Sequence, residues 1–323
     1  MVFYVYMSPD VILDAKNGGP YAIQNLIGIL LGFCQNCCLF EFKDNRWEKA
    51  VYSNADQLPP SNARKKIMVL LGELKKQGRF IRHLIPNHVI QSINIADVYA
   101  QAEKVLLDFL LAGENEIAHV SGRVETGALD NYNESGFESK RSNLASNGRL
   151  FQDSELDQTD FLKEVFKKVF MHTKRIEICD AIFGKYFGDN FEYSFSTLFK
   201  YVEKEVVNAG QIEKVVIHCR KPEICTDDHM KILLSRIKRG RLSNLKIEVR
   251  FYKSKEPDER LPALPHERFI MTDQVALNIG RGMDFLDKKT KRNRDILIKL
   301  AKEDEIKDSI NRCHNWMIEP VII

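Results

Sequence analysis

The sequence predicts an α/β protein of two domains. Its 323 residues are enough for two domains of ordinary size. Hydrophobic residues make up 44% of the chain, which supplies apolar cores, and 29% charged residues argue against a membrane or disordered protein. Strand-like and helix-like apolar spacings alternate along the second half, and this alternation is typical of helices packed on a sheet.

A polar segment separates the two expected domains. Residues 131–158 are rich in Asn, Ser, Gly and charge, and they lack regular apolar spacing. We expect a linker or mobile loop there, between an N-terminal α/β domain at 1–130 and a C-terminal domain at 159–323. The C-terminal domain has the more positive charge balance and is therefore the expected polyanion-binding part.

The C-terminal domain changes repeatedly between the two apolar periods. Helices are expected at 161–170, 193–207, 227–239 and 291–306. Strands are expected at 175–179, 215–219 and 245–252, followed by a hairpin that turns at Thr272-Asp273-Gln274. This order predicts a sandwich with a mixed sheet between helices.

The run LPHERFIMTDQVALNIGRGMDFLD holds the strongest chemical pattern of the chain. His266, Arg268 and Asp273 have the spacing H-x-R-x4-D, and Gly280 follows the aspartate after six residues. Residues two apart on a strand share a face, so His266 and Arg268 are expected side by side. A histidine, a guanidinium and a carboxylate are groups that can bind and attack a phosphate.

This motif resembles the signature of the phospholipase D superfamily, H-x-K-x4-D followed by G-S-x-N. The resemblance implies that His266 is the nucleophile, Arg268 holds the phosphate and Asp273 orients the histidine. Arg268 replaces the family's lysine, and Gly280-Arg281-Gly282-Met283 replaces G-S-x-N. The pattern is closer to the phospholipase D-like domain at the C-terminus of MIT-domain proteins, which reads roughly H-D-R-x-I through to G-R-G-L-D.

This closer resemblance covers about residues 158–323. It includes the segment RIEICDAIFGKYFGDNFEYSFSTLFKYVE, a strand that leads to an acidic residue and then a helix. Known members bind acidic phospholipid headgroups and dimerise without evident phospholipase chemistry. Catalysis in the superfamily needs two histidines, so one motif per chain implies a homodimer. Arg268 and Arg281 are the implied phosphate contacts, and no cofactor is expected in this domain.

The N-terminal run VFYVYMSPDVILDA resembles the opening of PIN-domain nucleases, with Ser8 at the position of that family's invariant aspartate. Carboxylates at suitable intervals can hold Mg²⁺ or Mn²⁺ and activate water for phosphodiester cleavage. The candidate metal ligands are Asp10, Asp14, Glu73, Asp97 and Asp130. Solvated helix faces and helix caps also explain acids at such positions, so both interpretations stay open.

An amphipathic helix is expected after Ser61 or Asn62, with Ile67, Leu70, Leu71 and Leu74 on its buried face. Its basic residues suit either a nucleic-acid backbone or a solvated face. Seven cysteines, an odd number, fit reduced thiols. The C-x-x-C-C run at 34–38 has no second ligand pair at zinc-finger distance and is expected in the core.

Localisation and function follow from these patterns. The first residues lack the features of a signal peptide, and no run of 18 apolar residues occurs, so we expect a cytoplasmic protein. The first functional hypothesis is a nuclease or nuclease-like effector on nucleic acid, in the manner of prokaryotic antiviral defence proteins. The alternative is a non-catalytic dimeric adaptor that binds an anionic phosphate of a lipid headgroup, nucleotide or nucleic acid. A separate regulatory protein is a possible further partner.

Overall fold

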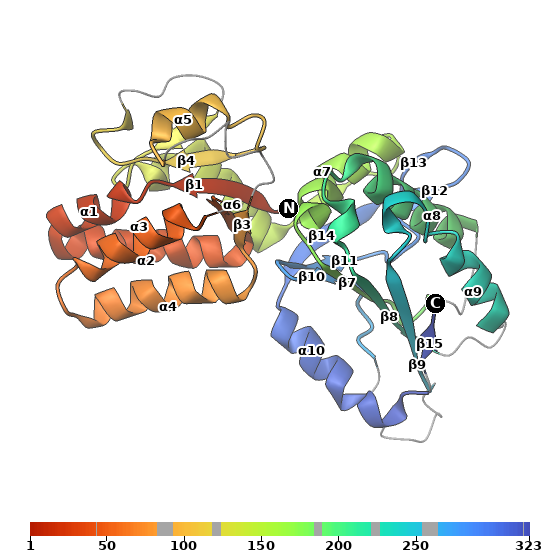
Figure 1. Ribbon diagram of the computed structural model, residues 1–323. Coiled ribbons are helices and arrows are strands. Elements are labelled where there is room, and N and C mark those ends of the chain that lie inside the picture. The colour runs from red at the N-terminus through yellow and green to blue at the C-terminus, as the bar shows by residue number, and fades with distance from the viewer. Residues whose placement is uncertain are drawn as a thin grey trace. The chain divides into compact units, whose positions relative to one another are not determined.

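The computed structural model describes residues 1–42, 44–82, 93–117, 124–183, 189–220, 227–253, 264–318 and 320–323. The chain divides into two compact units, 2–145 and 146–323, with Met1 assigned to the second. Both combine helices with a sheet, which confirms the predicted α/β class (Figure 1). Within the described ranges, none of the helices has the length and apolar character that crossing a membrane requires.

The N-terminal unit is built on a parallel sheet. Its strands are β1 (Phe3–Met7), β2 (Cys37–Glu41), β3 (Phe80–Arg82), β4 (Phe109–Leu111) and β5 (Glu125–Gly127). Their order is β3-β2-β1-β4-β5, and all four pairings are parallel. The residues of β1 and β2 are all buried, as is typical of central strands in a parallel sheet. From β1 the chain builds the sheet outward to β3 and then returns to the other side of β1 at β4.

The helices of this unit are α1 (Asp10–Asn17), α2 (Gly19–Asn36), α3 (Arg46–Asp56), α4 (Asn62–Lys76) and α5 (Ile95–Ala100). Helices α1 to α4 pack against one another (Figure 1). The amphipathic prediction is confirmed in α4, where the Ser61 hydroxyl accepts the Arg64 N–H at 3.2 Å and the four predicted apolar side chains are buried. Cys37 and Cys38 are buried in β2, as expected of core residues.

The segment 131–158 is folded, which corrects the expected linker or mobile loop. It contains η2 (Tyr132–Glu134), α6 (Gly136–Asn147) and β6 (Arg149–Phe151), and ends in the first residue of α7. Phe137 is buried, and so is Arg141, whose guanidinium donates to the Glu138 carboxylate at 2.7 Å. The prediction was wrong because a helix that buries one ring and one paired arginine shows no regular apolar spacing.

The C-terminal unit contains an eight-stranded mixed sheet in the order β15-β9-β8-β7-β10-β11-β14-β6. Its strands after β6 are β7 (Arg175–Cys179), β8 (Lys214–Arg220), β9 (Lys246–Tyr252), β10 (Phe269–Thr272), β11 (Ala276–Ile279), β14 (Ile296–Ala301) and β15 (Val321–Ile322). A separate two-stranded ribbon pairs β12 (Leu286–Asp287) with β13 (Arg292–Asn293). Strands β7, β8 and β9 are parallel, and all other pairings are antiparallel.

Helices lie on both faces of this sheet. They are α7 (Gln158–Met171), α8 (Asp189–Glu205), α9 (Asp227–Ser235) and α10 (Glu303–Arg312), with short turns η3 (Ala209–Gln211), η4 (Gly240–Leu242) and η5 (His314–Trp316). Figure 1 shows α7, α8 and α9 on one side and α10 on the other. Ile306 and Ile310 of α10 belong to a buried cluster with Phe269 and Met271 of β10.

The predicted helix at 291–306 is wrong. Residues 296–301 form β14, and α10 begins only at Glu303. Along β14, Ile296 and Ile298 are buried while Leu297 and Lys299 are exposed. This alternation has the period of a strand with one buried face, and the exposed leucine hid it in the sequence.

Candidate functional site

The two ends of the predicted motif lie at opposite ends of the strands of the C-terminal sheet. Strand β10 runs antiparallel to β7, with Phe269 beside Cys179 and Thr272 beside Ile176. Residues just before β10 therefore lie beside the end of β7, and residues just after β10 lie beside the start of β7. His266 and Arg268 lie beside the end of β7, and Asp273 lies beside its start.

The position of Asp273 corrects its predicted role as the acid that orients His266. Its Oδ2 accepts hydrogen bonds from the Thr173 hydroxyl at 3.1 Å and from the Lys174 and Arg175 N–H groups at 2.6 and 3.2 Å. A four-residue strand is about 13 Å long, so a carboxylate beyond its far end cannot reach the histidine. Asp273 instead fixes the start of β7.

Arg268 contacts two groups that lie, as it does, beside the end of β7. Its Nη1 donates to the Gly280 carbonyl oxygen at 3.1 Å, and its Nε lies 3.9 Å from Oδ1 of Asp180. The side chain is 19% exposed, so part of the guanidinium faces solvent. This arrangement presents a positive charge beside the end of β7.

Asp180 is a site residue that the motif did not predict. It directly follows β7, is fully buried, and accepts three main-chain N–H hydrogen bonds at 2.9 to 3.1 Å, from Ile182, Phe183 and Met283. Burial raises the pKa of Asp180 above its usual range, while these hydrogen bonds and Arg268 act against that shift. The sequence signal was the acid at the end of a buried strand.

Gly282 lies between these two charged groups. It has a φ of +87°, and a Cβ there would be 2.5 Å from Oδ2 of Asp180 and 2.8 Å from Cδ of Arg268. The Gly282 N–H donates to the Ile279 carbonyl at 2.7 Å, which closes a tight turn after β11. Only glycine fits this backbone conformation and this space without strain.

Arg281 extends from the same turn and shares a carboxylate with another arginine. Its Nε lies 3.3 Å from Oδ2 of Asp284, and Nη1 of Arg294 lies 2.8 Å from the same oxygen. An open hollow of about 520 Å³ adjoins this group. Its lining includes Arg268, Gly280, Arg281, Asp284 and Asp295.

His266 lies two residues before Arg268, and its side chain is exposed. It forms no hydrogen bond or ion pair with any other residue in the described part of the chain. Its imidazole is therefore free to contact a ligand, and no described carboxylate orients it. The structure places His266, Arg268 and Arg281 at the end of the sheet where β7 and β11 end, and it leaves Asp273 outside this group.

In the N-terminal unit, Asp10 and Asp14 gather with Glu116 around Gly113. A Cβ on Gly113 would lie 3.0 Å from Oε2 of Glu116, 3.1 Å from Cβ of Asp10 and 3.2 Å from Oδ2 of Asp14. These residues follow β1 and β4, the neighbouring strands between which the strand order reverses. Ligands of open parallel sheets bind at such a reversal, beyond the carboxyl ends of the strands.

Glu116 was absent from the predicted metal ligands. Its carboxylate accepts the Gly113 N–H at 2.7 Å and hydrogen-bonds the buried Ser8 side chain. Burial raises the pKa of Glu116, with smaller contributions from the charges of Asp10 and Asp14, although both hydrogen bonds act to lower it. Ser8 thus contacts a carboxylate from the segment after β4.

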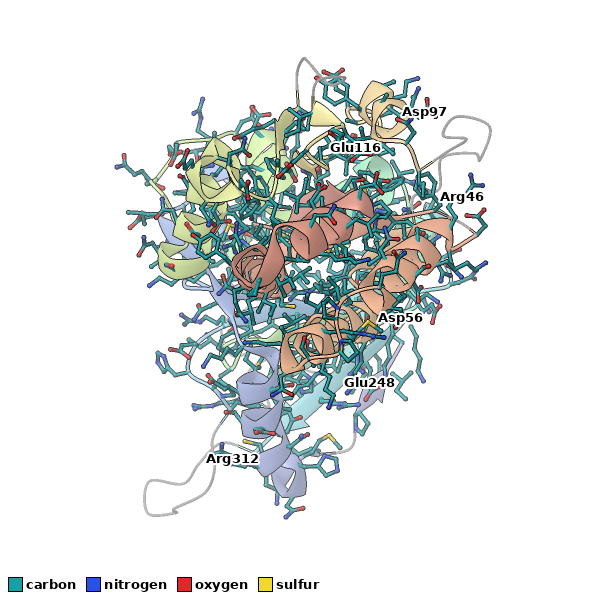
Figure 2. All side chains as sticks on the ribbon, turned by 90° about the vertical axis from the view of Figure 1, so that its left-hand side faces the viewer. Arg46, Asp56, Asp97, Glu116, Glu248 and Arg312 are labelled. Atoms are coloured by element: carbon teal, nitrogen blue, oxygen red, sulfur yellow. The ribbon has the colours of Figure 1, made fainter. Side chains whose placement is uncertain are left out.

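The other three predicted metal ligands are placed elsewhere on the unit. Glu73 is exposed on α4, Asp97 is exposed in the first turn of α5, and Asp130 is exposed after β5. Figure 2 labels Asp97 on α5 and Glu116 after β4. Among the residues that the structure describes, no three His, Cys, Asp or Glu side chains form a group able to hold a metal ion. The carboxylate oxygens suit Mg²⁺ or Mn²⁺ chemically, but their described positions do not form the predicted site.

The fold and site thus define a two-unit α/β protein with an arginine-rich edge on its C-terminal sheet. The chain matches no protein-family model and no curated protein.

Proposed function

We propose that this protein binds a phosphodiester group of nucleic acid through His266, Arg268 and Arg281, which lie where β7 and β11 of the C-terminal sheet end. The observation that carries the proposal is the position of the Arg268 guanidinium in the lining of an open hollow. The Gly280 carbonyl accepts a hydrogen bond from this guanidinium and Asp180 lies 3.9 Å from it, so part of the side-chain freedom is already lost before a ligand binds.

The hollow supplies suitable contacts for a phosphate. Arg268 and Arg281 both line it, and guanidinium groups make short, charge-assisted hydrogen bonds to phosphate oxygens. Each such bond contributes about 1.5 to 3 kcal/mol. Asp180 lies beside Arg268 outside the lining, whereas Asp284, which pairs with Arg281, and Asp295 line the hollow together with the two arginines.

Phosphodiester cleavage by His266 is the second candidate function, and an exposed imidazole two residues before Arg268 favours it. The histidine would form a bond to phosphorus while the ester oxygen leaves, and that oxygen needs a proton from a general acid. Water would then release the phosphate from the histidine. His218, whose carbonyl accepts the Asp180 N–H, has its imidazole buried against Glu177 and Tyr252, so the acid would come from a second copy of the chain.

Binding is tested by fluorescence anisotropy with labelled single- and double-stranded DNA and RNA at several salt concentrations. We expect Arg268→Ala to weaken binding at least about tenfold, because one fixed phosphate contact is lost. Arg312→Ala on α10 is the matched control, since it removes the same charge from an exposed position away from the hollow. Equal losses in both variants would contradict a defined phosphate site.

Cleavage is tested with the same substrates in Mg²⁺, Mn²⁺ or EDTA. Cleavage that persists in EDTA and is lost in His266→Ala would establish the histidine as the nucleophile. Cleavage that EDTA and Glu116→Gln both abolish would place the activity in the N-terminal unit instead. Binding without cleavage in every condition would leave the phosphate-binding adaptor as the function.

A further inference from the structure

A second pocket lies in the C-terminal unit, between α8 and the end of α9. Its volume is about 350 Å³, within the range of small-molecule pockets. Four basic and two acidic side chains line it, together with two apolar side chains, Phe199 and Ile237. It shares no lining residue with the hollow beside Arg268.

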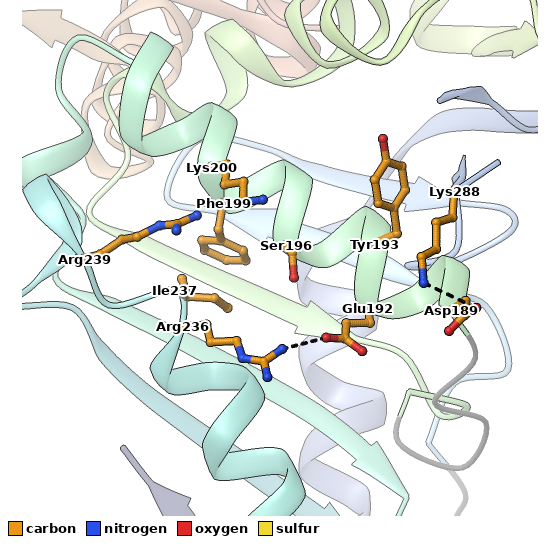
Figure 3. A pocket seen from close by; sticks show the side chains of 10 residues that line it. All are labelled: Asp189, Glu192, Tyr193, Ser196, Phe199, Lys200, Arg236, Ile237, Arg239 and Lys288. Atoms are coloured by element: carbon orange, nitrogen blue, oxygen red, sulfur yellow. Dashed lines mark hydrogen bonds and ion pairs between the residues drawn. The ribbon is translucent and has the colours of Figure 1, made fainter. Parts of the chain in front are cut away.

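Ion pairs fix the walls of this pocket. Nη1 of Arg236 lies 2.9 Å from Oε1 of Glu192, and Nζ of Lys288 lies 3.4 Å from Oδ2 of Asp189 (Figure 3). The first pair connects α8 to the segment after α9, and the second connects α8 to the segment after β12. Both acids in the lining are therefore already paired.

Lys200 differs from the other cations of the pocket. It forms no ion pair or hydrogen bond with another described residue, whereas Arg239 pairs with Glu203 at 3.3 Å. Figure 3 shows Lys200 and Arg239 at one end of the pocket, and Lys288 at the other. The Lys200 end thus has a positive charge available for an anion.

Uncharged groups between these two ends suit an organic part of the ligand. Phe199 and Ile237 are buried and supply apolar surface. The Ser196 hydroxyl lies between the Phe199 ring and Glu192 in Figure 3, and it forms no hydrogen bond with another described residue. A flat ring with polar edges can use both kinds of contact.

We infer that this pocket binds a mononucleotide, with its phosphate at Lys200 and Arg239 and its base over Phe199 and Ile237. The size of the pocket, the unpaired lysine and the apolar side chains together favour this class over inorganic phosphate, which would leave the apolar contacts unused. The inference does not depend on the phosphodiester site, because the two sites have no residue in common.

Calorimetric titration of the full chain with adenosine monophosphate, adenosine and inorganic phosphate tests the inference. We expect the nucleotide to bind more tightly than either of its parts. Lys200→Gln should weaken nucleotide binding about tenfold, since one charged contact is lost. Lys204→Gln, one turn further along α8 and outside the pocket, should leave it unchanged.

Three results would overturn the inference. They are the absence of nucleotide binding, equal affinity for adenosine and its monophosphate, and equal effects of Lys200→Gln and Lys204→Gln. Nucleotide binding that is lost in Arg268→Ala and kept in Lys200→Gln would also overturn it, because the ligand would then occupy the phosphodiester site. Loss of nucleic-acid binding in Arg268→Ala alone would leave this pocket unaffected.

Discussion

Gly282→Ala tests whether the turn after β11 positions Arg268. The added methyl would enter a space that already holds the Asp180 carboxylate at 2.5 Å and the Arg268 Cδ at 2.8 Å. Because Asp180 is fully buried and fixed by three main-chain hydrogen bonds, it cannot move without losing at least one of them.

The expected loss of stability is about 1 to 5 kcal/mol. A φ of +87° costs an alanine about 1 to 2 kcal/mol, and a lost hydrogen bond to a buried carboxylate costs about 1 to 3 kcal/mol. The lower entropy of the unfolded alanine chain offsets about 0.4 to 1 kcal/mol of this. Gly210→Ala in the same unit is the control, since its Cβ would meet only the Arg241 carbonyl oxygen, at 3.8 Å.

Urea unfolding followed by circular dichroism measures the stability of both variants, and anisotropy measures their affinity for nucleic acid. We expect Gly282→Ala to lower both, whereas Gly210→Ala stays within about 0.5 kcal/mol of the native protein. Equal unfolding midpoints for the two variants would refute the argument that Gly282 is needed between Asp180 and Arg268.

Three further predictions concern residues away from the hollow. Asp273→Ala should cost about 1 kcal/mol in urea unfolding, because three hydrogen bonds are lost, and an unchanged nucleic-acid affinity would confirm its structural role. Arg141→Ala should lower the free energy of unfolding by about 3 to 5 kcal/mol in the same assay, because the Glu138 carboxylate, the Gly32 carbonyl and the Asn36 side chain lose their donor. A loss below about 1 kcal/mol would contradict this. Burial alone would raise the pKa of Glu248, but Lys214 and Arg250 lower it to about 2. The stability advantage of the native protein over Glu248→Gln, about 1 kcal/mol at neutral pH, should therefore vanish as the pH falls from 4.5 to about 2; a constant difference would contradict the ion pairs.

Local periodicity made much of the fold predictable. The strand expected at 175–179 has the same bounds as β7. In α4 the four expected side chains are buried, and the cap is Ser61, one of the two residues expected there. Both segments bury side chains at regular intervals, so the spacing of their apolar residues indicates the secondary structure directly. The predicted hairpin also forms, as β10 and β11, but His266 and Arg268 precede β10, so the prediction that a strand carries them on one face was wrong.

Long-range contacts made the site harder to predict. Asp180 and Met283 are joined by a hydrogen bond across 103 residues of sequence, and no local pattern indicates that pairing. Glu116 similarly meets Asp10 and Asp14 only because β1 and β4 are neighbours. The separation of His266 from Asp273, in contrast, was predictable, because a strand between them has a known length.

Strand β6 determines where a fragment of the C-terminal unit has to begin. Its residues pair with β14, and its buried Phe151 ring lies 5.1 Å from that of Phe161 in α7. A recombinant fragment cut at 159 would lose this strand and leave the backbone of β14 unpaired along one side. Open strand edges of this kind recruit other chains and promote aggregation. A fragment that begins at 146 keeps β14 paired, so residues 146–158 belong to the folded C-terminal unit and have to be kept in the fragment.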